Sequence, residues 1–212
     1  MKPITLARVV ERAPMRTVRW KDVAQTSTNA PRDLARLEDE GVVLKIAQGV
    51  YTAPPDGADG RRWKPPLEAA GLALATARFG QRRVALMGLG AARFWGAIPR
   101  AIGTTTIAVP VAGRPPVTLT TGGTVHLIPR DLDALDLVLE RTPLGEALIT
   151  TPAQALYDVL ARPMQGGAPD VAREAAANLR VRVDADELRG IAGRARRVPL
   201  AVQKTIADME AS

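Results

Sequence analysis

Apolar residues at the start of the chain recur at near-helical spacing: Ile4, Leu6, Ala7, Val10 and Ala13. Charged side chains occupy the positions between them, so we expect an amphipathic helix that ends before Pro14. Residues 17–20 can then supply either a short strand or the entry into a second helix. That second helix should be brief, over 20–25, with Val23 and Ala24 facing the interior.

A polar turn and a further amphipathic helix follow. The small polar residues 26–29 favour a turn that caps the next helix, and Pro31 fits the first turn of that helix. We expect the helix over 30–40, closed by Gly41. Its buried stripe should consist of Ala30, Leu34 and Leu37.

Two short apolar runs complete this region. Residues 42–46 and 50–52 flank a tight turn that contains Gly49, which predicts a β-hairpin. Helix, short helix, polar turn, helix and hairpin within about fifty residues is the order of a winged helix-turn-helix. We therefore expect a DNA-binding domain over residues 1–60.

The third helix of such a domain enters the major groove with its N-terminal end at the base edges. Arg32 and Arg36 lie one turn apart on one face, and either can donate a bidentate pair of hydrogen bonds to guanine. Asn29 can pair with adenine, and Thr28 can hold a phosphate. In the alternative, the arginines only solvate the helix, with Arg36 paired to an acidic residue one turn on, or the fold serves protein interaction.

Polar and basic residues outside the third helix extend the expected interface. Lys45 and Gln48 of the hairpin should touch the neighbouring DNA backbone or the minor groove. A turn-rich boundary precedes a stiff basic linker over 61–66, where Arg61 and Arg62 can add phosphate contacts. A linker that only aids solubility is the open alternative.

Residues 67–212 predict a second, larger domain that mixes helices and strands. A strongly apolar, alanine-rich run predicts a helix over 67–79. Short strands are expected over 84–87, 104–109, 117–120, 124–128, 136–140 and 146–150. Helices that begin with a capping residue or a proline follow over 151–160, 169–180, 184–196 and 199–209. The fold class is therefore α+β, with a small sheet that is antiparallel or mixed and a helical C-terminal part.

The segment Gly88-Leu89-Gly90 half resembles a dinucleotide-binding fingerprint. Arg93 stands where the third glycine belongs, and no acidic residue follows about twenty positions on. We therefore attribute these glycines to a helix start that packs closely against its surroundings.

The inventory of reactive side chains is small. Cysteine is absent and His126 is the only histidine, so zinc sites, thiol nucleophiles and disulfides are excluded. We expect His126 to be a half-exposed strand residue. Asp131, Asp133 and Asp136 alternate with leucines, which is typical of a solvent-facing segment rather than of a metal site. The inventory predicts neither an enzyme nor a cofactor.

Charge and hydropathy narrow the class of partner and the compartment. With 29 Lys and Arg against 22 Asp and Glu, the net charge is +7 and the pI about 10.5, a balance that suits contact with phosphates. No stretch approaches the ~18 consecutive apolar residues of a membrane span, and no secretory signal is visible. We expect a cytoplasmic protein that does not contact membranes.

Three motifs carry a resemblance to a known family: Gln-Gly-Val-Tyr-Thr at 48–52, Met-Gly-Leu-Gly-Ala-Ala at 87–92, and Leu-Gly at 144–145 followed by the helix start at 151–160. With these motifs the chain resembles the AbiEi family of antitoxins over nearly its whole length. The resemblance implies a repressor of its own operon that binds inverted repeats in promoter DNA, as a monomer or a homodimer. It also implies that residues 67–212 counteract a cognate nucleotidyltransferase-like toxin.

Two other functions stay open at the level of the sequence. One is a ligand-responsive winged-helix repressor whose C-terminal sheet holds a small molecule. The other is a DNA-modifying enzyme that uses the aspartates named above, which the missing metal-site spacing disfavours. The neighbouring gene distinguishes the antitoxin from the ligand-responsive repressor. A nucleotidyltransferase gene favours the antitoxin, and a gene for a metabolic enzyme favours the ligand sensor.

Overall fold

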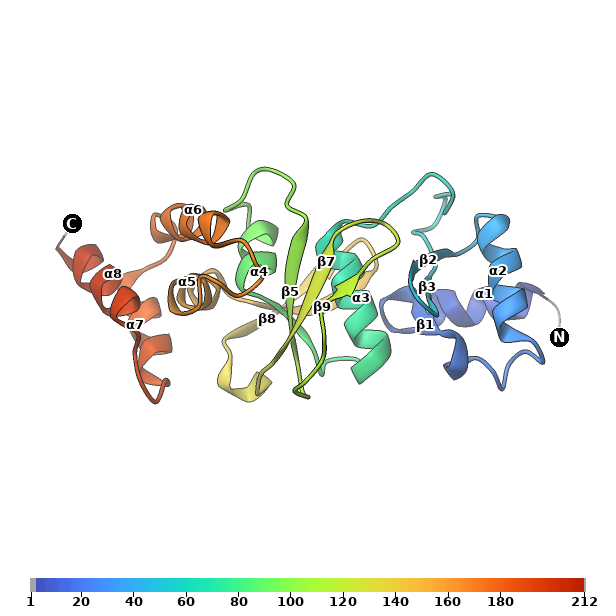
Figure 1. The fold of residues 1–212 in the computed structure, drawn as a ribbon, viewed down its shortest axis with the longest axis horizontal. Coiled ribbons are helices and arrows are strands. Elements are labelled where there is room, and N and C mark those ends of the chain that lie inside the picture. The colour runs from blue at the N-terminus through green and yellow to red at the C-terminus, as the bar shows by residue number, and fades with distance from the viewer. Residues whose placement is uncertain (1–2, 212) are drawn as a thin grey trace.

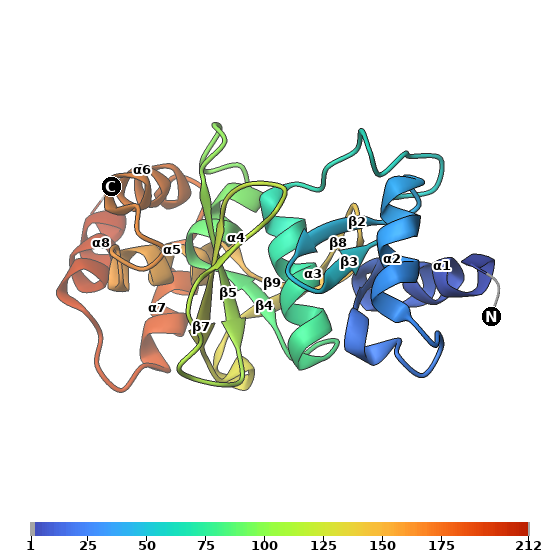
Figure 2. The same ribbon diagram turned by 45° about the vertical axis from the view of Figure 1, so that its right-hand side comes forward.

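Two β-sheets of unequal size organise the chain, and the computed structural model describes residues 3–211. The molecule is elongated, with α1 and α2 at one end and the C-terminal helices at the other (Figure 1). Figure 2 shows that helix α3 lies between the two sheets. The fold is therefore α+β, as the sequence predicts.

The N-terminal segment contains two α-helices, two 3-10 turns and three short strands. In chain order they are α1 (Pro3–Arg12), a 3-10 turn (Pro14–Arg16), β1 (Thr17–Arg19), a second 3-10 turn (Trp20–Asp22), α2 (Ala30–Asp39), β2 (Leu44–Ala47) and β3 (Val50–Thr52). The small sheet has the order β1-β3-β2, and both strand pairs are antiparallel. The predicted hairpin and the buried stripe of α2 are confirmed, since Ala30, Leu34 and Leu37 are all buried.

The predicted second helix over 20–25 is wrong. Only a single 3-10 turn forms there, and Ala24 is exposed, although Val23 is buried as expected. The physical reason lies in the small sheet, because the backbone amide of Trp20 donates a 2.9 Å hydrogen bond to the carbonyl of Gly49. The chain therefore leaves the sheet at the residue where the helix was expected to begin.

The second part of the chain forms a six-stranded mixed sheet with the order β6-β7-β5-β4-β9-β8. Its elements are α3 (Leu67–Phe79), β4 (Ala85–Met87), α4 (Gly88–Phe94), β5 (Thr104–Val109), β6 (Val117–Thr118), β7 (Thr124–Pro129), β8 (Leu137–Thr142) and β9 (Gly145–Thr150). The pairs β4–β9 and β5–β7 are parallel, and the other pairs are antiparallel. All the strands expected beyond residue 67 are present, and the mixed option for the sheet is the correct one.

Four helices close the chain: α5 (Pro152–Ala161), α6 (Pro169–Arg180), α7 (Ala185–Gly193) and α8 (Leu200–Glu210). The Thr151 side chain caps α5 by accepting a hydrogen bond from the Gln154 amide, and Asp184 caps α7 in a capping box with Glu187. Helix α7 ends at Gly193, three residues earlier than expected. The helical C-terminal part is confirmed.

Close packing explains the glycines after β4. A Cβ atom on Gly90 would lie 2.4 Å from Thr105 Oγ1 and 2.6 Å from Leu86 Cδ1, far inside van der Waals contact. Gly88 begins α4 at a φ of +51°, a backbone region that favours glycine. The interpretation of this segment as a tightly packed helix start is confirmed.

Each sheet has its own main hydrophobic core, and a small third cluster of Ala85, Met87 and Ala108 also belongs to the large sheet. The smaller core is formed by Leu6, Val10, Val18, Val23, Ala30, Leu34, Leu37, Val43, Tyr51 and Ala53. Four other residues of the N-terminal segment belong instead to the larger core, namely Met15, Ile46, Ala47 and Val50. The first sixty residues therefore have a core of their own and also share apolar contacts with the rest of the chain.

Across the described residues, no helix combines the length and the apolar character that a membrane crossing requires.

Candidate nucleic-acid interface

The start of α2 is held by the polar turn that precedes it. The Asn29 side chain accepts a 3.4 Å hydrogen bond from the Arg32 amide, and Ser27 Oγ donates to Asp33 Oδ2 at 2.5 Å. Ser27 Oγ also accepts from the Asn29 amide at 3.2 Å. Asp33 lies in the first turn, where a negative charge is favoured by the helix dipole. These contacts fix both the position and the direction of the helix N-terminus.

The two arginines of α2 have different surroundings. Arg36 Nη2 lies 3.5 Å from Asp33 Oδ1, and Arg36 Nε lies 4.0 Å from Glu40 Oε1, with the Arg36 side chain 48% exposed. The Arg32 side chain is exposed and makes no ion pair or hydrogen bond with any of residues 3–211. Exposed ion pairs at these distances contribute roughly 0–1 kcal/mol, so Arg36 can exchange partners. Arg32 is the cation of this helix that is free to bind an outside group.

Thr28 and Asn29 are exposed at the start of the helix, as expected. The Asn29 amide oxygen already accepts the capping hydrogen bond from Arg32. A bidentate pair with adenine needs both the oxygen and the nitrogen of the side-chain amide. Asn29 therefore has a structural task in the free protein in addition to the base contact expected of it.

The hairpin turn is short and lies against an aromatic ring. Gln48 is exposed in the turn, and Lys45 is half-buried on β2. A Cβ atom on Gly49 would lie 2.6 Å from Trp20 Cδ1, so the Trp20 ring covers the turn while staying 45% exposed itself. Gln48 and the surrounding turn can touch a partner surface, whereas Lys45 has less reach.

The first arginine of the basic linker, Arg61, is ion-paired with Asp59, which lies just before the linker. Arg61 donates to both carboxylate oxygens of Asp59, with the shortest contact at 2.7 Å between Nη2 and Oδ2. Hydrogen bonds from the Arg61 side chain and backbone lower the pKa of Asp59 to about 2. Arg62 is exposed and is the better placed of the two linker arginines to bind a phosphate.

A cationic cleft lies where the small sheet meets α3, and the sequence analysis did not identify it. The cleft has a volume of about 290 Å³ and is lined by Arg19, Lys21, Arg78, Phe79 and Arg114. These residues come from three segments that are far apart in the chain, so no local pattern marks them. Each cation by itself has the ordinary appearance of a solvated side chain.

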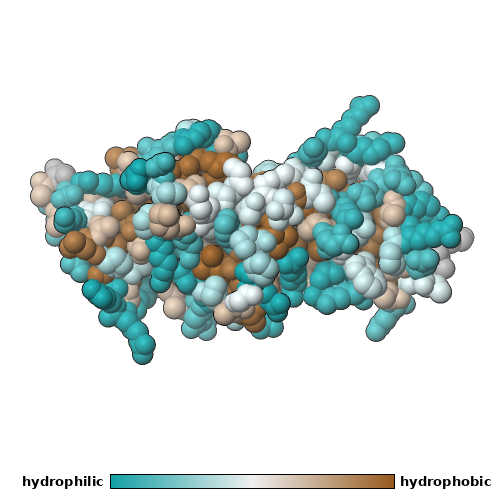
Figure 3. All heavy atoms as spheres, viewed as in Figure 1, coloured by the Kyte–Doolittle hydropathy of each residue, from teal (hydrophilic) through white to brown (hydrophobic). Residues whose placement is uncertain are grey.

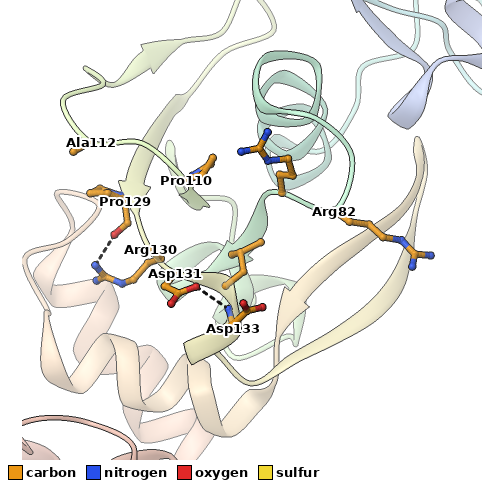
Figure 4. Close-up of a pocket in the computed structure, with 9 residues that line it drawn as sticks. Arg82, Pro110, Ala112, Pro129, Arg130, Asp131 and Asp133 are labelled. Atoms are coloured by element: carbon orange, nitrogen blue, oxygen red, sulfur yellow. Dashed lines mark hydrogen bonds between the residues drawn. The ribbon is translucent and has the colours of Figure 1, made fainter.

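A second depression, of about 820 Å³, lies at the edge of the large sheet and includes Arg82, Arg130 and Asp131. Figure 4 shows that Arg82 and Arg130 extend in opposite directions. Arg130 Nη1 donates to the Pro129 carbonyl at 2.9 Å, and Asp131 accepts from the Asp133 amide at 3.2 Å. The polar groups of this depression do not converge on a common point.

Of the three aspartates singled out in the sequence, Asp131 and Asp136 have hydrogen-bond partners within the fold. Asp136 accepts a 2.8 Å hydrogen bond from Thr151 Oγ1, and Asp133 is exposed. Within residues 3–211, no three His, Asp or Glu side chains lie close enough to hold a metal ion. His126 is half-exposed in β7, as expected, and burial lowers its pKa.

The carboxylate of Asp158 differs from these aspartates because it is buried and one of its oxygens has no hydrogen-bond partner among residues 3–211. Asp158 in α5 is almost fully buried, and burial raises its pKa to about 6, against the lowering effect of Arg130. Its Oδ1 atom accepts a 3.2 Å hydrogen bond from Gln154 Nε2, whereas Oδ2 has no hydrogen bond within the described structure. Gln154 in turn accepts from the Asp136 amide at 3.2 Å. These contacts tie α5 to the start of β8.

The chain was compared with known proteins by sequence and by structure, and only the structure gave a match. No protein-family model matches the sequence, and no curated protein matches it. Among solved structures, the chain is similar to the crystal structure of the RV2827C protein from Mycobacterium tuberculosis, with a TM-score of 0.60 and 21% sequence identity. The alignment covers 98% of this chain and 74% of that chain. At this identity the likeness shows a shared fold and nothing about activity.

Proposed function

We propose that the protein is a DNA-binding transcriptional regulator and that residues 1–60 act as a winged helix-turn-helix. The order of elements supports this proposal, because β1 pairs with a hairpin that follows α2 and closes a three-stranded sheet. The 3-10 turn at Trp20–Asp22 stands in the place of the second helix. In such domains the helix before the hairpin is the one that enters the major groove.

The single observation that carries the proposal is the free guanidinium of Arg32 at the capped N-terminus of α2. The side chain is exposed and makes no ion pair within residues 3–211, while the helix that bears it is fixed by Ser27 and Asn29. An arginine on a helix fixed in this way can donate two hydrogen bonds to guanine O6 and N7. Figure 3 shows hydrophilic side chains over most of the end of the molecule that α1 and α2 form, as DNA contact requires.

For the biological role, we propose an antitoxin that represses its own operon, on the basis of the AbiEi resemblance. The chain would bind inverted repeats upstream of its gene, and residues 67–212 would counteract a nucleotidyltransferase-like toxin. The polar contacts of Asp136, Gln154 and Asp158 support a structural rather than a catalytic task for that part. A protein contact suits a domain of this kind.

The DNA proposal is tested by titrating the protein against a labelled duplex from upstream of its gene, in parallel with a scrambled duplex. We expect the upstream duplex to bind at least ~10³-fold more tightly at fixed salt, the lower end for specific complexes. Equal affinity for the two duplexes would refute sequence-specific regulation.

The antitoxin proposal has a separate test. Co-expression with the product of the adjacent gene should yield a complex on affinity purification, and it should relieve growth arrest caused by that product alone. Growth arrest that persists in the presence of the protein would contradict the antitoxin role and leave DNA binding unaffected.

A further inference from the structure

Four cations converge on the cleft between the small sheet and α3. Arg19 and Lys21 come from the end of β1 and the turn after it, Arg78 comes from the last turn of α3, and Arg114 comes from the loop between β5 and β6. The cleft therefore joins the N-terminal segment to the larger domain. Phe79 is the apolar part of its lining.

The positive charge of this cleft is only partly neutralised from within the protein. Arg19 donates two hydrogen bonds to Asp22, at 2.6 and 2.8 Å. Arg78 and Arg114 make no ion pair or side-chain hydrogen bond in the part of the chain that the structure describes, although Arg78 is half-buried. Burial, followed by repulsion from Arg114 and Arg19, lowers the pKa of Arg78. A group of cations held together at this cost stabilises the fold little and is suited to an external anion.

The cleft lies on the same side of the molecule as the start of α2. Figures 1 and 2 both show the beginning of α2 and the end of α3 toward the lower edge of the view. The two parts of the chain cannot turn freely about each other, because Thr120 of the large domain is hydrogen-bonded to the carbonyls of Lys45 and Ile46 on β2. The cleft therefore keeps one orientation relative to α2.

We propose that this cleft binds backbone phosphates of the same DNA duplex that α2 reads, so that the larger domain is part of the DNA interface. The proposal rests on the DNA-binding function proposed above and adds a second contact region to it. Each phosphate that an arginine neutralises releases counterions from the duplex. The contribution is to affinity and to the orientation of the duplex, and it carries no sequence information.

The test compares the salt dependence of binding to the upstream duplex for the wild type and for the double variant Arg78→Gln/Arg114→Gln. The slope of log Kobs against log salt is negative, and loss of two phosphate contacts should reduce its magnitude by about 2 and weaken binding about tenfold or more near 0.1 M salt. The ratio of affinities for the upstream and scrambled duplexes should stay unchanged. This last readout separates the cleft from Arg32, whose loss should reduce that ratio.

Two controls make the result decisive. Arg173→Gln/Arg197→Gln removes the same charge from exposed positions in the C-terminal third and should leave the slope near that of the wild type. Arg114→Gln alone changes only an exposed loop, so the magnitude of its slope should fall by about 1 even if replacement of the half-buried Arg78 disturbs folding. A wild-type slope in both Arg114 variants would overturn the inference while the regulator proposal stands. Absence of DNA binding by the wild type would overturn both.

Discussion

The backbone amide of Thr120 donates a 3.0 Å hydrogen bond to the carbonyl oxygen of Ile46, and the Thr120 hydroxyl donates to the carbonyl of Lys45. The two bonds connect a loop of the large sheet to β2 of the small sheet. The Ile46 side chain is fully buried in the larger core although it belongs to the hairpin. The hairpin is therefore a structural joint between the two sheets as well as a candidate DNA contact.

This joint leads to a prediction about stability. Replacement of Ile46 by alanine should lower the free energy of unfolding by about 2–4 kcal/mol, because it removes buried methyl groups and leaves a cavity between the domains. Urea denaturation followed by circular dichroism measures the change. Val111→Ala, at an exposed apolar position, serves as the control and should change the value by less than about 0.5 kcal/mol. A small effect at Ile46 would mean that the joint contributes little.

The unequal surroundings of the two α2 arginines predict unequal effects on DNA recognition. Arg32→Ala should reduce the preference for the upstream duplex over a scrambled one by about 1–3 kcal/mol, the contribution of a bidentate guanine contact. Arg36→Ala should have a smaller effect, because Asp33 and Glu40 compete for its guanidinium. Fluorescence anisotropy titrations with both duplexes provide the measurement. A larger loss of preference for Arg36→Ala would reverse the assignment of the reading residue.

Asp158 predicts a specific pH dependence of stability. Its pKa is raised from 3.8 to about 6 in the folded protein, mainly by burial, so the folded state binds the proton more tightly than the unfolded chain does. The free energy of unfolding should therefore fall as the pH rises from about 4 to about 6, by up to about 3 kcal/mol for a shift of this size.

Asp158→Asn removes this titration and tests its origin. The free energy of unfolding of the variant minus that of the wild type should be larger at about pH 7 than at about pH 4. The wild type carries a buried negative charge at about pH 7, and the variant does not. Urea denaturation at both pH values measures the difference, with Glu146→Gln, at an exposed position near the start of β9, as the control. Parallel pH profiles for Asp158→Asn and the wild type would show that another group is responsible.

The packing of α4 predicts a penalty at one glycine and none at another. Gly90→Ala should destabilise the protein by about 1–3 kcal/mol, because the added methyl group would overlap Thr105 and Leu86. Gly103→Ala should be nearly neutral, since nothing lies within 4 Å of its Cβ position and its backbone is not left-handed. Thermal unfolding of the two variants side by side distinguishes packing from a general effect of glycine replacement. Equal melting temperatures of the two variants would contradict the role of close packing at Gly90.

Local patterns in the sequence were sufficient for most elements. The stripe of α2 follows from a period of 3.6 residues, and the six strands of the large sheet follow from short runs between proline and glycine turns; both depend only on neighbouring side chains. The failure at residues 20–25 has a non-local cause, because the Trp20 amide pairs with Gly49, which lies far along the chain. A local helical pattern contains no information about a hydrogen bond to a residue that is distant in the sequence.

The sequence by itself determined most of the secondary structure, the fold class, the cationic balance and the exposed positions on α2, because each depends on residue type and spacing along the chain. The tertiary structure decided which cations are free and which are paired. It left Arg32 open, placed Asp33 and Glu40 beside Arg36, and gathered Arg19, Arg78 and Arg114 around one cleft. Charge interactions depend on distance in space, and only the folded chain fixes those distances.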